Sequence, residues 1–231
     1  MNWVDYVVIV ILLVNGIGGL SKGLIITVFN LFGFILSLYI AKLYYPVVAN
    51  FIKNNPNIIG TIKEYVTTRV EIIMNKIGNS GSIGDFFEIL KLPSKLGENM
   101  INDPNVNSYM NNTMNTASDM ISTKLTGLFI DIISIIIVFL AAKFILYIIV
   151  SILDNIAHLP VLRQINKLAG LVFGLIKGVF ILYILFAIIT PVITMFPDGA
   201  ITKGVYDSTI GYYLYSNNLI IDYLKGYGLF K

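Results

Sequence analysis

The chain has 231 residues, of which 56% are hydrophobic and only 13% are charged, and its mean hydropathy is +0.80. Soluble domains carry about a quarter charged residues, so this composition excludes an ordinary water-soluble protein and indicates a membrane protein. The net charge of +3 is too small to predict nucleic-acid binding, and the absence of cysteine excludes disulfides and thiolate chemistry.

Residues 1–45 form the first expected unit, a transmembrane hairpin. The segment 3–45 is almost continuously apolar, and one crossing takes about 20 helical residues. Two helices therefore fit, over roughly residues 3–20 and 23–45, with a turn near Ser21-Lys22-Gly23. The N-terminus lacks a basic segment and has Asp5 in its place, so we expect a retained span and not a cleaved signal peptide.

Residues 46–124 form the second expected unit, a water-facing excursion with equal numbers of basic and acidic residues. Aliphatic residues recur every three or four positions from Ile58 to Ile77, which predicts an amphipathic helix over 57–77. A Ser-x-x-Asp cap at Ser82 predicts a short helix that stops at Pro93. The Asn-rich stretch that follows predicts a loop or a weak helix.

Residues 125–195 form a second expected hairpin, and residues 196–231 an interfacial tail. Apolar runs cover about 126–150 and 168–190, the second closed by Pro191. The tail alternates tyrosines with aliphatic residues, which predicts a helix with tyrosine rings at headgroup level. The expected fold class is therefore all-α: a polytopic membrane protein with four transmembrane helices, an extracytoplasmic amphipathic helical excursion and a C-terminal interfacial helix.

The distribution of basic residues predicts the orientation. Both hairpin turns share one side, which holds five basic residues against the single acid Asp154: Lys22, Lys143, Arg163, Lys167 and Lys177. Cytoplasmic loops carry an excess of lysine and arginine. We therefore expect the turns in the cytoplasm and both termini outside.

The two halves of the chain share a similar sequence pattern. Asp5 opens the first predicted span and Asp131 the third, while a Gly-Leu-x-Lys-Gly element precedes the second and lies in the fourth. A parallel repeat of a two-helix unit explains this pattern. Coincidence among abundant isoleucine, leucine and glycine explains it equally well, so both interpretations stay open.

Glycines and charges within the predicted spans are the candidate site residues. Gly170, Gly174 and Gly178 share one face of the fourth helix, and Gly19 and Gly23 share a face at the start of the second. Small residues at this spacing favour close helix packing inside the bundle, and a protomer interface or a pore lining is the alternative.

Four charged residues are candidates for a membrane charge or anchor: Asp5, Lys22, Asp131 and Lys177. The two lysines fit as anchors at the cytoplasmic face, with Lys177 deep enough to need snorkelling. Asp5 fits a helix cap. Asp131 fits either a cap or a functional carboxylate that pairs with a lysine or couples protons.

No pattern predicts an enzyme. His158 is the single histidine and has no acid at ligand spacing, so we expect a solvated loop residue and no metal site. P-loop, GxSxG, HExxH and dinucleotide-binding fingerprints are lacking. We therefore expect no cofactor and no catalytic residues.

Two segments resemble a known family. They are "VDYVVIVILLVNGIGGLSKGLIITVFNLFGFILSLYIAKLYYP" and "LDNIAHLPVLRQINKLAGLVFGLIKGVFILYILFAII". An early Asp, a Gly-basic-Gly turn, a Leu-Asp connector and a Gly-x-x-x-Gly entry to the last span are similar to the CvpA, or colicin V production protein, family of bacterial inner-membrane proteins. That family often has two basic residues in the first turn, whereas this chain has only Lys22.

The resemblance implies a location in the inner membrane and a role in peptide-toxin production or export and in envelope maintenance. It transfers no catalytic residue. The alternative function is a small channel or transporter with a glycine-lined pathway between helices 2 and 4. The expected partners are the lipid bilayer, further copies of the chain in a homo-oligomer, and envelope or secretion proteins, but no nucleic acid.

Overall fold

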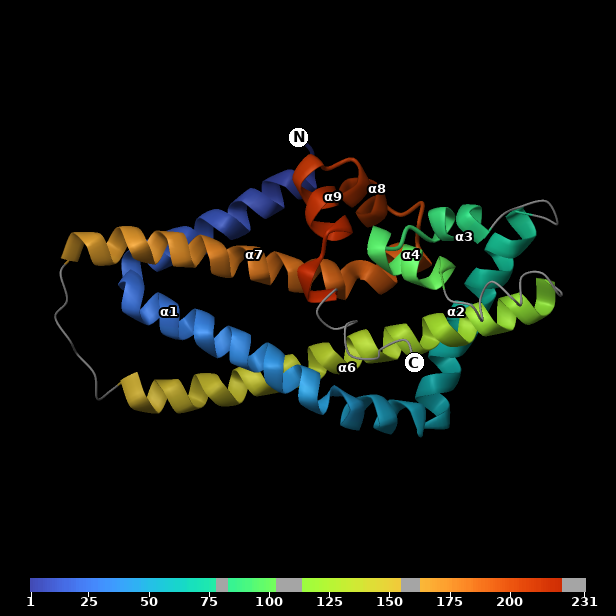
Figure 1. Cartoon of the computed structure of the whole chain (residues 1–231), viewed down its shortest axis with the longest axis horizontal. Coiled ribbons are helices and arrows are strands. Elements are labelled where there is room, and N and C mark those ends of the chain that lie inside the picture. The colour runs from blue at the N-terminus through green and yellow to red at the C-terminus, as the bar shows by residue number, and fades with distance from the viewer. Residues whose placement is uncertain (78–82, 103–113, 155–162, 222–231) are drawn as a thin grey trace.

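The computed structural model describes residues 1–77, 83–102, 114–154 and 163–221, and within these ranges it contains helices and no strand. Residues 103–113 of the Asn-rich stretch 101–120, His158 and the last residues of the tail lie outside the described residues, and residues 114–120 of that stretch belong to a helix. Figure 1 shows the arrangement of the helices. They are α1 (Trp3–Lys53), α2 (Pro56–Ile77), α3 (Ile83–Leu90), α4 (Ser94–Ile101), α6 (Met114–Asp154), α7 (Arg163–Met195), α8 (Ala200–Tyr206) and α9 (Thr209–Ser216).

Helix α1 consists of two arms that meet at a sharp turn. Gly23 has φ 80° and ψ 173°, a conformation that lies outside the helical region and is open to glycine. The first arm therefore runs toward one end of the molecule and the second arm returns, as Figure 1 shows in blue. The turn lies where the sequence predicts it. The second arm extends past the predicted end at residue 45 to Lys53, with Pro46 inside the helix.

Within the described ranges, three helices are long and apolar enough to cross a membrane: α1, residues Ser118–Ile148 of α6, and residues Asn166–Met195 of α7. Many of their large apolar side chains are exposed, among them Phe29 and Phe32 on α1 and Tyr147 on α6. Such exposure is costly in water but favourable against lipid. The chain is therefore an all-helical membrane protein.

Helices α6 and α7 both extend beyond the predicted spans. α6 begins at Met114, twelve residues before the start expected at residue 126. α7 begins at Arg163 and continues through Pro191 to Met195, although the sequence predicts that Pro191 ends it. Proline lacks the N–H for one intrahelical hydrogen bond and its ring crowds the carbonyl four residues earlier, but membrane helices tolerate it where neighbouring groups satisfy the freed backbone.

Four hydroxyl groups buried in the long helices are satisfied within their own helix, whereas the Oγ atoms of Ser118 and Ser122 near the start of α6 have no partner among the described residues. Thr27, Ser37, Ser134 and Thr190 each donate to the carbonyl four residues earlier, over 2.6–2.9 Å. An unpaired hydroxyl in an apolar environment costs about 1–3 kcal/mol, so this local bond lets polar residues occupy buried positions.

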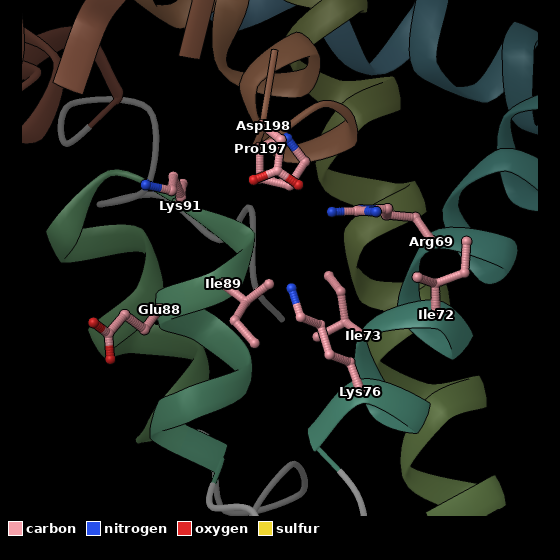
Figure 2. Close-up of a pocket in the computed structure, with 9 residues that line it drawn as sticks. All are labelled: Arg69, Ile72, Ile73, Lys76, Glu88, Ile89, Lys91, Pro197 and Asp198. Atoms are coloured by element: carbon pink, nitrogen blue, oxygen red, sulfur yellow. The ribbon is translucent and has the colours of Figure 1, made fainter. Parts of the chain in front are cut away.

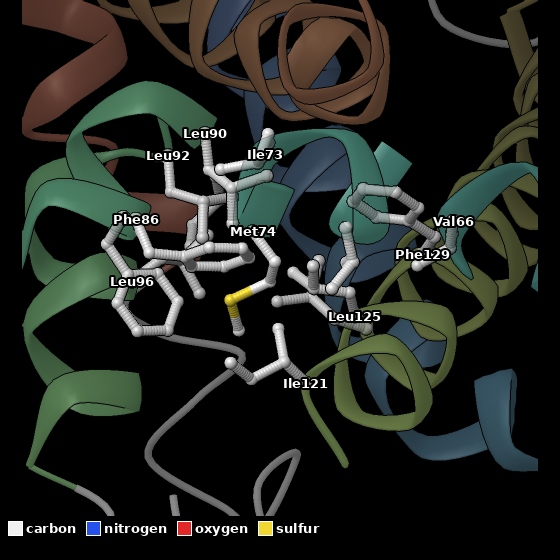
Figure 3. Packing of buried hydrophobic residues seen from close by; sticks show 14 of the residues in the cluster. Val66, Ile73, Met74, Phe86, Leu90, Leu92, Leu96, Ile121, Leu125 and Phe129 are labelled. Carbon is white, nitrogen blue, oxygen red and sulfur yellow. The ribbon is translucent and has the colours of Figure 1, made fainter. Parts of the chain in front are cut away.

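The excursion folds into a helical cap on the first turns of α6. Its core joins α2, α3 and the segment around α4 to the start of α6, as Figure 3 shows for Met74, Phe86, Leu90 and Leu125. The predicted amphipathic helix at 57–77 corresponds to α2, and its regularly spaced face supplies Val66, Val70 and Ile73 to this core. The excursion therefore has a hydrophobic core of its own, continuous with α6.

The tail differs from the single interfacial helix that the sequence predicts. It forms α8 and α9, which lie beside the N-terminal end of α1 (Figure 1). Tyr215 is fully buried, and its hydroxyl donates to the Lys91 carbonyl over 2.7 Å. Burial raises the pKa of Tyr215 well above its usual value, so the hydroxyl keeps its proton. Tyr212 and Tyr213 are exposed as expected, but tertiary contacts hold the tail against the bundle.

Candidate functional site

The glycines of α1 and α7 lie in direct backbone contact. A methyl group on Gly19 would collide with the Gly170 carbonyl oxygen, and one on Gly174 would collide with the Asn15 carbonyl oxygen. Gly178 lies deeper along the same contact, against Leu12 and Asn15. The first arm of α1 and the first half of α7 therefore pack antiparallel at a distance that only glycine permits.

Gly23 serves a different purpose from Gly19. The sequence places both on one face at the start of the second helix, and this is wrong because the turn at Gly23 separates them. Gly19 belongs to the end of the first arm. At the turn, the Asn166 side chain of α7 accepts a hydrogen bond from the Leu24 backbone N–H over 2.7 Å. An asparagine from another helix thus caps the start of the second arm.

Asp5 links the start of α1 to the start of α9. It is fully buried and forms a capping box with Asn2 at the start of α1. Its other oxygen accepts hydrogen bonds from the Ser208 hydroxyl over 2.6 Å and from the Ile210 N–H over 3.1 Å. Because Ser208 is the N-cap of α9, one carboxylate serves two helix N-termini, where negative charge is favoured.

Asp131 forms an ion pair between helices. Its carboxylate lies 3.2 Å from the Lys53 ammonium, the last residue of α1. The Asp131 side chain is 12% exposed and the Lys53 side chain 41%. The cap interpretation of Asp131 is wrong, because α6 begins at Met114 and the residue lies well inside the helix. The functional alternatives remain, pairing with a lysine or proton coupling, and for pairing the structure supplies Lys53 as the partner.

Lys22 and Lys177 lie at a cleft between the arms of α1 and α7. We call it the lysine cleft; its volume is about 270 Å³. It is lined by Val14, Asn15, Gly18, Gly19, Lys22, Thr27, Asn30, Gly174 and Lys177. The two lysines reach it from different helices, and the glycine contact forms one of its walls.

A second cleft lies between α2, α3 and the segment before α8. We call it the cap cleft; its volume is about 380 Å³. Figure 2 shows Arg69 and Lys76 of α2 extending from one side toward Asp198, with Lys91 on the far side. The Nε atom of Arg69 is buried and has no hydrogen-bond partner. Such an arrangement of opposite charges around unfilled space can bind a polar group.

The sequence does not single out several of these residues. Lys53 lies 78 positions before Asp131, and Asn166 lies 142 positions after the backbone group that it caps. No local spacing links such partners. The sequence places Lys53 in the water-facing excursion, past the predicted end of the second span at residue 45, whereas the structure makes it the last residue of α1.

The fold and these sites define a helical membrane protein in which two buried carboxylates, Asp5 and Asp131, join separate helices. The family model for the Colicin V production protein matches residues 4–74 and 107–214, and the chain belongs to this family. The resemblance drawn from the two quoted segments is thereby confirmed. No curated protein and no solved structure matches the chain.

The glycine contact predicts opposite effects at two neighbouring positions. Gly19→Ala should destabilise the protein by about 1–3 kcal/mol, because its methyl group meets backbone that must move. Gly18→Ala is the matched control: nothing lies within 4 Å of its added methyl group. Since alanine favours a helix over glycine, Gly18→Ala should be neutral or slightly stabilising. Thermal unfolding in detergent measures both, and equal effects would contradict the contact.

The Lys53–Asp131 pair predicts an asymmetry between its partners. Lys53→Met leaves a nearly buried carboxylate without a counter-charge, whereas Asp131→Asn leaves an ammonium that can reach water. We expect Lys53→Met to lower the free energy of unfolding by about 2 kcal/mol more than Asp131→Asn. Denaturant unfolding of the two variants in the same detergent measures this difference.

The same variants separate a structural from a proton-coupling role of Asp131. If the carboxylate only pairs with Lys53, the loss of cellular function in Asp131→Asn should follow the loss of stability. A stable and abundant Asp131→Asn variant without any function would instead show that the charge itself acts.

Proposed function

We propose that this chain supports the production or export of a peptide toxin and the maintenance of the cell envelope, as a non-enzymatic protein of the inner membrane. The observation that carries the proposal is the family match, which covers the spanning helices and continues into α9. The geometry supports the non-enzymatic part. Asp5 lies on the first arm of α1 and Asp131 on α6, and each is engaged in contacts between elements, with different partners. The proposal includes no cofactor.

The orientation that we propose places the Gly23 turn in the cytoplasm and the helical cap outside. The Gly23 turn and the start of α7 lie at one end of the molecule, and α2, α3 and α4 lie toward the other (Figure 1). The basic residues Lys22, Lys167 and Lys177 belong to the turn side, which agrees with the positive-inside rule. The cap cleft then faces envelope and secretion proteins.

Self-association is part of the proposal, and the glycine contact limits its form. The glycine face that could have joined two protomers is occupied by contacts within one chain. A homo-oligomer would therefore use exposed apolar faces, such as that of Phe29 and Phe32.

Single cysteines test the orientation, because the natural sequence has none. Ser21 beside the turn and Glu71 on α2 are both exposed. Glu71→Cys should react with a membrane-impermeant thiol reagent on intact cells, and Ser21→Cys should react only after the cells are opened. Permeable reagent provides the control for accessibility of both. The reverse pattern would overturn the proposed orientation.

Toxin release tests the function. In a bacterial strain that lacks its own member of the family, we expect this chain to restore the growth-inhibition zone around toxin-producing colonies. Gly18→Ala should restore it equally and Gly19→Ala less, since only the second disturbs the contact of α1 with α7. A chain that is inserted and abundant but restores nothing would refute the proposal.

A small channel or transporter is the second candidate, and the lysine cleft favours it. Gly18 lines this cleft, and nothing lies within 4 Å of a Cβ added there, so a leucine side chain would start in open space and extend into the cleft. Gly18→Leu should then stop ion flux through purified protein in liposomes while leaving the protein stable. Gly33→Leu, also beside open space, is the matched control. Absence of flux in the unmodified protein would remove this candidate.

A further inference from the structure

We propose that the lysine cleft binds the phosphate of an anionic lipid headgroup. Two lysines from different helices meet there, Lys22 at the α1 turn and Lys177 on α7, and Lys143 on α6 is the third lysine of the cluster, outside the lining of the cleft. Lys22 and Lys177 line the cleft, and the charges of Lys22 and Lys143 both act on Lys177. The inference goes beyond toxin export and does not depend on it.

None of the three ammonium groups has a carboxylate partner among the described residues. The Lys143 ammonium lies 5.4 Å from the centre of the Phe34 ring and 5.8 Å from that of Phe139, which attract it only weakly. Lys177 is half-buried, and like charges near a partly buried ammonium repel it unless an anion neutralises them. The cluster therefore favours a negative group that the described residues do not supply there.

The chemistry of the cleft fits a phosphate. Asn30 lines the cleft, and its amide has no hydrogen-bond partner among the described residues, so it can donate to a phosphate oxygen. Asn15 and Thr27 already donate to carbonyls of their own helix and contribute less. With about 270 Å³, the cleft can accept a headgroup phosphate.

The surroundings of the cleft favour a lipid over a free anion. Val14 lines the cleft and is itself largely exposed, and Ile17 and Phe29 nearby on α1 are exposed as well. A bound headgroup would place its acyl chains against these apolar side chains. Basic pockets between transmembrane helices are a recurrent setting for anionic headgroups.

The test uses the purified full-length protein in detergent, with added phosphatidylglycerol, phosphatidylcholine or inorganic phosphate. Thermal stabilisation and lipid retention in native mass spectrometry report binding. We expect phosphatidylglycerol to bind at least about tenfold more tightly than phosphatidylcholine. Lys177→Gln and Lys22→Gln should each weaken the binding of phosphatidylglycerol about fivefold, the factor that matches one lysine contact to an anionic lipid.

Two controls make the result specific. Lys167→Gln removes an exposed lysine on the same helix that does not line the cleft, and it should leave binding unchanged. Lys177→Arg keeps the charge and should retain the preference. If Lys177→Gln does not fold, Lys22→Gln carries the test, since Lys22 is exposed at the turn.

Equal binding of both lipids, or binding that neither glutamine variant weakens, would overturn the proposal. Stabilisation by inorganic phosphate as strong as that by phosphatidylglycerol, and lost in the same variants, would support the anion site but overturn the lipid as its source.

Discussion

Backbone contact between the first arm of α1 and α7 is the constraint on which the rest of the arrangement depends. Lipid supplies no hydrophobic force to join helices, so association requires close packing. Gly19, Gly170 and Gly174 provide it because a side chain on any of them would strike the opposing backbone. The same contact brings Asn166 to the Gly23 turn, where it caps the second arm. The direction of the second arm, the contact of that arm with α6 and the shape of the lysine cleft follow from this junction.

The charged residues of the long helices fall into two groups, which differ in whether the chain supplies a partner for the charge. The carboxylates are paired within the chain: Asp5 with helix N-termini and Ser208, and Asp131 with Lys53. Each joins segments that are distant in sequence. The hydrogen bonds of Asp5 and the ion pair of Asp131 offset the cost of burying each charge. Lys22, Lys143 and Lys177 have no such partner among the described residues. The excess is therefore positive, and it lies at the end of the bundle that holds the Gly23 turn, opposite the helical cap.

The excursion and the tail are coupled to the membrane helices and to each other. The cap core includes residues of α6, and Tyr215 of α9 reaches the backbone of Lys91 beside α3. Lys91 has a positive φ of 52°, which is uncommon for a residue with a side chain, and the contact with Tyr215 helps to hold it there. Its ammonium lies over the Tyr206 ring of α8. Because Lys91 also lines the cap cleft, movement of the tail would shift one side of that cleft.

What the sequence by itself determined is the class of the protein, the family, the position of the first turn and the amphipathic face of α2. These depend on hydropathy, glycine and helical periodicity, which are local properties of the chain. Only the tertiary structure decided where helices continue past Pro46 and Pro191, that α8 and α9 pack against α1, and that Asp131 pairs with Lys53 and not with its own helix end. Those outcomes depend on which distant groups meet, and partners separated by tens of residues leave no periodic trace in the chain.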